Sequence, residues 1–350
     1  MAVTAETLRI VDRLRRQLTV MTDAQTLALT RAWVDAWDVL EPDFQTAVVE
    51  LMAGAVDGKI SRAVVAKNIR LRDALQTARA MLDELARLTE VTVTTDVAQA
   101  VLDAMDGHAA LIGSQLPPNA TTAGVSFTRM SPEALAAIVE RTTKQIHADT
   151  RPLAADVERV MKRELIRGIA VGENPRATAG RILKQTEGRF NGGLTRALTI
   201  ARTETLDAHR AATKASEKTN KDILEEWEWH AALNRRTCPS CWSKHGTRHP
   251  LDEPGPNDHQ NGRCARVTIT KSWKDLGFDI EEPPSLTKNA EAEFANLTPA
   301  TQRDIMGGQR LELLQSGKIS WADLSSKTES TGWRDSYTVT PVKDLIAKAA

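Results

Sequence analysis

The placement of the cysteines constrains this chain more than any other feature. All three lie within 27 positions of a chain of 350 residues. Cys238 and Cys241 are separated by two residues, His259 follows after seventeen more, and Cys264 after a further four. A Cys-x-x-Cys turn places two thiolates on one side of a tetrahedral zinc ion, and a distant histidine and cysteine can complete the shell. The spacing therefore predicts a metal site made of these four residues.

The segment between these ligands has little material for a core of its own, because glycine and proline recur in it. A structural zinc ion contributes about 10–16 kcal/mol of apparent binding free energy to the folding of a small metal domain. Four protein ligands would leave no coordination position for a substrate or an activated water. We therefore expect a structural zinc ion and no catalysis at this site.

Other interpretations of the cysteines stay open at this point. They could be small buried apolar residues, or a reactive Cys-x-x-Cys pair, although no βαβ pattern accompanies the pair. A disulfide is disfavoured because the cysteine count is odd and the expected compartment is reducing. The histidine ligand is also open, since His245 and His249 lie in the same loop-rich segment as His259.

Charge and hydropathy argue against several classes of protein. The chain carries 46 basic and 46 acidic residues, so a general nucleic-acid coat, which needs a basic excess, is disfavoured. Residues 162–214 are locally basic and could contact DNA or an acidic partner. No apolar run approaches the roughly 18 residues of a membrane span, and charges recur through the first 18 residues. We expect the protein to be made and kept in a cytoplasm.

Hydrophobic periodicity predicts a mainly α fold, in which an N-terminal helical bundle or hairpin precedes a C-terminal α+β subdomain with a small zinc-stapled β element. Helix breaks are expected at the Asp-Gly pair 57–58, at the β-branched stretch 89–95 and at Gly192-Gly193. The predicted parts are a helical region at 1–115, a linker at 116–130, a helical part at 131–220, a zinc-knuckle β subdomain at 221–275, and a linker, C-terminal helix and tail at 276–350.

Strand patterns occur on either side of the cysteines. Residues 223–233 alternate in polarity and contain Trp227 and Trp229, which indicates a strand with one buried face. The β-branched run around 267–269 indicates a second strand. A small β element is therefore predicted next to the metal site.

Three motifs in a fixed order give the chain a family resemblance. They are Ile-Ala-Arg-Thr-Glu at 200–204, Arg-Thr-Cys-Pro-Ser-Cys at 236–241 and His-Gln-Asn-Gly-Arg-Cys at 259–264. In this order, with a tryptophan-containing strand after the first, they resemble the phage head morphogenesis family, the group similar to the F protein of phage Mu and the minor capsid protein of phage SPP1. The resemblance covers about residues 150–270. Gly262 stands where the family pattern usually has a cysteine, so a metal site here has to use the neighbouring histidine and cysteine.

The resemblance implies a structural minor capsid or head morphogenesis protein of a tailed phage, not an enzyme. It implies a low-copy protein at or near the portal, inside the head. The implied partners are the portal protein, then scaffold or major capsid protein, and packaged DNA, since relatives are implicated in head assembly and DNA delivery. Such a protein would be in the host cytoplasm during assembly and in the virion afterwards.

Five charged residues near these motifs are candidates for docking or for contact with an anion. Arg202 and Glu204 are two positions apart on a predicted helix and cannot face each other, so we expect separate salt bridges that dock this helix on the zinc subdomain. Arg235, Arg236 and Arg263 flank the predicted ligands and could contact phosphate or another anion. No catalytic role is assigned to any of them.

Two other functions compete with a structural role. A metal-dependent nuclease of the His-Asn-His type also combines Cys-x-x-Cys with an Asp-His pair, and Asp258, His259 and Asn261 superficially match it. The sequence has no second Cys-x-x-Cys and no histidine after 259, which disfavours this interpretation. A zinc-containing DNA-binding protein is the other competitor, and no helix-turn-helix or zinc-finger recognition pattern accompanies the cluster.

Overall fold

A computed structural model describes residues 3–53, 67–120, 124–150, 175–329 and 335–349 of the chain. These residues form two compact units that are each built from separate stretches of sequence. Unit 1 contains Met1–Thr19, Ala98–Val139 and Leu206–Ala350, and unit 2 contains Val20–Val97 and Glu140–Thr205. The predicted metal ligands all lie in unit 1. The boundaries predicted along the sequence stay predictions.

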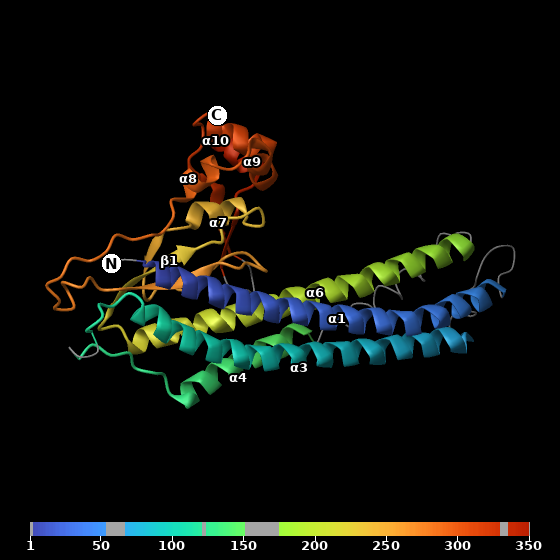
Figure 1. Ribbon diagram of the computed structural model, residues 1–350. Helices are drawn as coiled ribbons and strands as arrows, with labels where there is room; N and C mark the ends of the chain where they lie inside the picture. The colour runs from blue at the N-terminus through green and yellow to red at the C-terminus, as the bar shows by residue number, and fades with distance from the viewer. Residues whose placement is uncertain (1–2, 54–66, 121–123, 151–174, 330–334, 350) are drawn as a thin grey trace. The chain divides into compact units, whose positions relative to one another are not determined.

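The described chain is mainly helical, as the sequence predicts. The long helices are α1 (Ala5–Ala53), α3 (Ile69–Gly113) and α6 (Pro175–Thr219), and α4 (Pro132–Thr150) is shorter. Each of the three long helices contributes residues to both units (Figure 1). Among the described helices, none is both long and apolar enough to cross a membrane.

Two of the predicted helix breaks are wrong, and the third, at 57–58, lies outside the described residues. Helix α3 runs through 89–95, where Thr89 and Val93 are fully buried. The hydroxyls of Thr89 and Thr95 donate to helix carbonyl oxygens four residues earlier, at 2.7 and 3.0 Å, so both are satisfied inside the helix. Helix α6 runs through Gly192 and Gly193. A glycine costs about 1 kcal/mol in a helix interior, and tertiary packing can override a penalty of that size.

A small antiparallel sheet forms in unit 1, as predicted. Its strands are β1 (Leu224–His230), β2 (Arg248–Pro250) and β3 (Ala265–Thr270), in the order β2-β1-β3. The two predicted strands correspond to β1 and β3, whereas the sequence gives no pattern for the three-residue strand β2. Because β1 is central, it pairs with β2, which lies between Cys241 and Cys264, and with β3, which begins directly after Cys264.

The apolar core on β3 comes from the start and the end of the helical N-terminal region. Val267 and Ile269 are fully buried against the first turns of α1 and the last turns of α3. The other buried members of this cluster are Val3, Ile10, Val11 and Leu111. The first residues of the chain therefore belong to the same unit as the sheet, although more than two hundred positions separate them in sequence.

The C-terminal region folds into short elements instead of the single helix and tail that the sequence predicts. Gly307 and Gly317 adopt positive φ angles of 75° and 69°, which end or interrupt helices. The elements are α7 (Pro239–Lys244), α8 (Ala290–Ala295), α9 (Pro299–Met306), α10 (Gly308–Gln315), the 3-10 helix η1 (Trp321–Leu324), β4 (Ser325–Thr328), β5 (Ser336–Val339) and α11 (Val342–Ala349). Figure 1 shows α8, α9 and α10 close together, above α7 in this view. Trp242 of α7 is part of their buried core.

Candidate metal centre

The Cys-x-x-Cys motif forms a capped helix start. Cys238 is the N-cap residue of α7 with an extended backbone, and Pro239 occupies the first helical turn, where a missing N–H costs nothing. The sulfur of Cys238 accepts a hydrogen bond from the backbone N–H of Cys241 at 3.4 Å. This cap holds the two thiols on the same side of the turn.

The second half of the cluster lies on a tight turn just before β3. The N–H of Gly262 donates to the carbonyl oxygen of His259 at 2.9 Å. Asn261 has a φ of 62°, and asparagine is one of the residues that tolerate this left-handed conformation. The turn brings His259 and Cys264 back toward α7.

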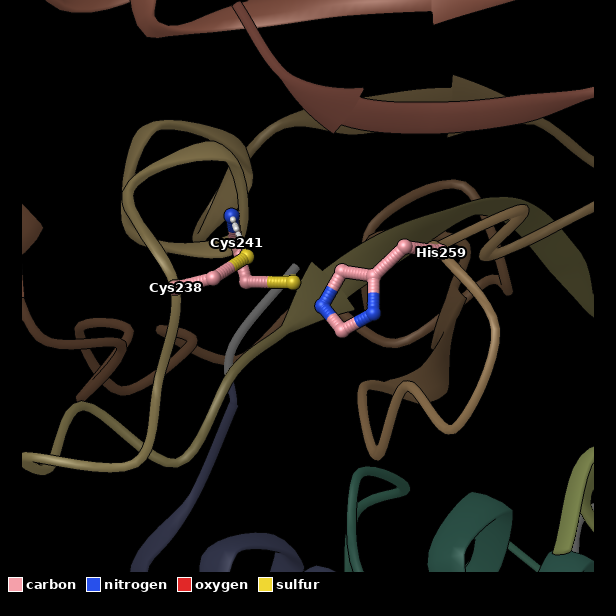
Figure 2. A group of neighbouring side chains, drawn as sticks. All are labelled: Cys238, Cys241 and His259. Carbon is pink, nitrogen blue, oxygen red and sulfur yellow. Dashed lines mark hydrogen bonds between the residues drawn. The ribbon is translucent and has the colours of Figure 1, made fainter. Parts of the chain in front are cut away.

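The predicted ligands converge. The donor atoms of Cys238, Cys241 and His259 all lie within 4.8 Å of one another, and so do those of Cys241, Asp258 and Cys264. Figure 2 shows the imidazole ring of His259 facing the two thiols of the turn. Cys241 belongs to both groups, so all four predicted ligands are joined through its sulfur.

Hydrogen bonding fixes which nitrogen of His259 faces the thiols. Its Nδ1 donates to the carbonyl oxygen of Gln260 at 2.8 Å, which leaves Nε2 for the cluster. Hydrogen bonding to Cys238 raises the pKa of His259 to about 9, and hydrogen bonding to Cys241 lowers the pKa of Cys238 to about 5. Hydrogen bonds to Cys238 and Cys264 raise the pKa of Cys241. Metal binding has to displace the protons that hold this cluster together.

The two substitute histidines lie elsewhere. His249 stacks on Trp227 at a centroid distance of 4.4 Å, and its ring nitrogens contact Glu253 and Thr247 at 3.0 and 2.9 Å. The Nδ1 of His245 accepts from the backbone of Ala231 at 3.0 Å. Among the described histidines, His259 is therefore the one placed to bind a metal with the cysteines.

Arg210 on α6 holds the turn that carries two of the ligands, and sequence reasoning missed it. Its guanidinium contacts the carboxylate of Asp258 at 2.9 and 3.0 Å, and it donates to the carbonyl oxygens of Gly262 and Cys264 at 3.2 and 2.8 Å. Asp258 is fully buried and also accepts from the N–H of Cys264 at 3.1 Å. This bridge fixes the position of Cys264 from the outer side of the cluster.

A second buried ion pair joins α6 to β3. Arg266 and Glu217 have side chains that are each 1% exposed, and their atoms approach to 2.7 Å. The remaining N–H groups of Arg266 donate to backbone carbonyl oxygens at 251, 253 and 255, and its guanidinium lies 4.3 Å from the ring centre of Trp227. Arg210 and Glu217 are seven residues apart, so they lie two turns apart on one face of α6.

The carboxylate of Asp258 explains the glycine at position 262. A Cβ atom on Gly262 would overlap this carboxylate, which is held in place by Arg210. No side chain fits at position 262 while Asp258 stays there. The family pattern usually has a cysteine where this chain has Gly262, and here the carboxylate of Asp258 fills the space that a side chain at position 262 would need.

The candidate docking residues have mixed outcomes. The expectation that Arg202 docks on the zinc subdomain is wrong, because its guanidinium pairs with Asp23 of α1 at 3.4 Å. Glu204 is buried. Arg235 pairs with Asp304 of α9 at 2.7 Å between two exposed side chains. The contacts that were expected from the 200–204 motif are made further along α6, by Arg210 with Asp258 and by Glu217 with Arg266. The signal that could have shown it is a charged pair, Arg210 and Glu217, seven positions apart on one face of the helix.

The donor set suits zinc. Three thiols and one imidazole are the soft and intermediate ligands that structural zinc sites use. The Asp258 carboxylate already accepts hydrogen bonds from Arg210 and Cys264, which suits a supporting residue better than a ligand. The residues present therefore fit a Cys₃His zinc site.

Comparison with known proteins places this region in a family. Residues 159–267 match the family model described as "Phage Mu protein F like protein", and this span includes all four clustered ligands and both bridging residues of α6. No match was found among curated proteins or among solved structures. This family model supports a phage head morphogenesis family. The segment from residue 159 to residue 267 is thus similar to phage Mu protein F like proteins, and this confirms the predicted resemblance to the phage head morphogenesis family.

Proposed function

We propose that the protein is a minor structural component of a tailed-phage head whose Mu F like region folds around one zinc ion. The observation that carries this proposal is a pair of clusters inside the matched region that share Cys241: Cys238 and His259 lie in one, and Asp258 and Cys264 in the other. The match supports a head protein, and the donor set supports the metal.

Zinc would act here through stability. The four ligands would hold it. Cys241 of α7 and Cys264 before β3 already pack in a buried apolar cluster with Trp227 and Trp229, and the ion would add a direct link between them. Four protein ligands leave no open position for catalysis. A nuclease would need an open position on the metal, and the test below includes nuclease activity as one of its outcomes.

We further propose that the protein acts at or near the portal, inside the head. Its proposed partners are the portal protein, then scaffold or major capsid protein, and packaged DNA. The support for this is the family resemblance, together with the locally basic segment at 162–214, part of which lies outside the described residues. The same proposal places the protein in the host cytoplasm during assembly and in the virion afterwards.

The test is complementation of a phage that lacks this gene. Wild-type protein should restore infectious particles and appear in purified heads by mass spectrometry, and it should co-purify with the portal protein. Cys238→Ser should fail in all three respects, whereas Lys318→Ala, at an exposed position, should behave as wild type. Normal heads without the protein would contradict the proposal, and metal-dependent cleavage of plasmid DNA that His259→Ala abolishes would favour a nuclease.

A further inference from the structure

A cavity of about 210 Å³ opens beside the metal centre, inside unit 1. One wall is helix α1, and the others are the loop before α7 and the turn that precedes β3. Its polar lining includes Arg15, Thr19, Asn234, Arg236, Asn261 and Arg263. The four predicted metal ligands, Cys238, Cys241, His259 and Cys264, line the same cavity. The other charged residues among the described lining are three arginines, and no carboxylate is among them.

Arg15 has unused donors in this cavity. Its side chain is 19% exposed, and one nitrogen, Nη1, contacts Asp12 at 3.0 Å. Its Nε and Nη2 atoms are buried and have no hydrogen-bond partner among the residues that the structure describes. A guanidinium cannot lose its proton in a protein. Buried N–H groups on a charged side chain cost more than about 1–3 kcal/mol when nothing accepts from them, so this site favours an acceptor that carries negative charge.

Arg236 and Arg263 add two more guanidinium groups to the lining. Arg236 is exposed, and its side chain forms no ion pair with a described residue. Guanidinium groups present pairs of N–H donors in a plane, which matches the oxygens of a phosphate group.

The nearby sulfur atoms do not cancel this charge. With zinc bound, three thiolates and one neutral imidazole would give the centre a formal charge of −1. Asp12, which pairs with Arg15, adds another −1, against +3 from the three arginines. A formal charge of +1 would remain in the zinc-loaded protein.

We propose that this cavity is an oxyanion site that binds one phosphate group, with Arg15 at its base and Arg236 and Arg263 around it. The phosphate could be free or part of a nucleic-acid backbone, because both present the same oxygens. The proposal rests on the cavity and on the unpartnered donors of Arg15. It does not depend on the role in the phage head.

The experiment is isothermal titration calorimetry of the full-length, zinc-loaded protein with inorganic phosphate, at ionic strength held constant with chloride. Wild type should show saturable binding. Arg15→Gln should weaken binding about tenfold or more, because it removes charge-assisted hydrogen bonds. Arg236→Ala, at an exposed position that should not affect folding, should weaken it several-fold. Arg16→Ala is the matched control, since Arg16 is an exposed neighbour on the same helix outside the lining.

Three results would overturn the proposal. The first is the absence of saturable binding to wild type, and the second is equal affinity in Arg236→Ala and Arg16→Ala. The third is acetate competing as well as phosphate, which would assign the site to carboxylates. If Arg15→Gln lowers zinc content while phosphate never binds, Arg15 serves only as a counter-charge to the thiolates.

A second experiment identifies the source of the phosphate by adding a short DNA duplex as a competitor in the same titration. Competition between the duplex and inorganic phosphate, lost in the same two variants, would assign the site to the nucleic-acid backbone. Binding of inorganic phosphate without competition would assign it to a free phosphate.

Discussion

The segment around the metal centre and the helices that follow residue 290 lie in the same compact unit, but different kinds of side chain hold them together. The metal centre is surrounded by buried ion pairs, Arg210 with Asp258 and Arg266 with Glu217. The C-terminal helices share an apolar core in which Phe294 packs edge-on against Trp242 at 5.5 Å. The region around the candidate metal centre thus combines a small apolar cluster, in which Trp227 and Trp229 are buried, with buried charges and a proposed metal, whereas the C-terminal helices depend on burial of apolar surface alone.

This difference predicts which substitutions should lower the stability of each region most. A charge network loses most of its value when one member is removed, because the remaining charge is left buried without a partner. An apolar core loses an amount that depends on the volume removed. The same chemical treatment should therefore affect the two regions unequally.

Removal of the metal should have the largest effect. A strong chelator should abolish hydrogen-exchange protection in 238–264 and in the strands on either side, because about 10–16 kcal/mol of apparent binding energy is lost. Protection in α9 and α10 should persist, since their contacts are apolar. Exchange followed by mass spectrometry measures both. Equal loss in the two regions would show that the C-terminal helices depend on the metal as well.

Breaking the second ion pair should have the next largest effect. Arg266→Met should lower the free energy of unfolding by about 3–5 kcal/mol, because the carboxylate of Glu217 stays buried without its partner. The double variant Arg266→Met/Glu217→Leu should recover much of the loss. Urea denaturation at saturating zinc measures both. Arg235→Ala is the control, since its pair with Asp304 is exposed and should contribute less than about 1 kcal/mol.

A core substitution should separate the two regions. Phe294→Ala should cost about 3–5 kcal/mol and leave the zinc content at one ion per chain. Trp242, the neighbour of Phe294, directly follows Cys241, which makes this a demanding test. Zinc loss in purified Phe294→Ala protein that is still folded would mean that the apolar core also positions the knuckle.

Crowding at the turn should have the smallest effect. Gly262→Ala should destabilise by about 1–3 kcal/mol, because the added methyl group meets a carboxylate that Arg210 holds in place. Gly192→Ala is the matched control. A Cβ there meets no atom within 4 Å, and alanine in a helix interior should stabilise by about 0.5–1 kcal/mol. Thermal unfolding of the two variants would contradict this account if Gly262→Ala were the more stable.

The sequence predicted the parts of the site that depend on local spacing. Short-range patterns predict the Cys-x-x-Cys turn and the position of His259. They also predict the tryptophan-containing strand β1 and the β-branched strand β3. Arg210 and Glu217 could not be predicted in the same way, because their partners lie about fifty positions away and no local pattern identifies them. The predicted docking role of Arg202 failed for the same reason.

The errors in secondary structure also have physical causes. The β-branched stretch and the Gly-Gly pair were expected to break α3 and α6, but these local preferences are weak, and both stretches lie inside helices of 45 residues. The C-terminal elements were missed because each is four to eight residues long and its pattern is too short to recognise.

The most direct test of the central claim is zinc X-ray absorption spectroscopy on full-length protein purified without chelators, together with elemental analysis. The account predicts one zinc ion per chain with three sulfur ligands at about 2.3 Å and one nitrogen ligand at about 2.0–2.1 Å. Protein that is folded and free of zinc, or a zinc shell dominated by oxygen, would contradict it.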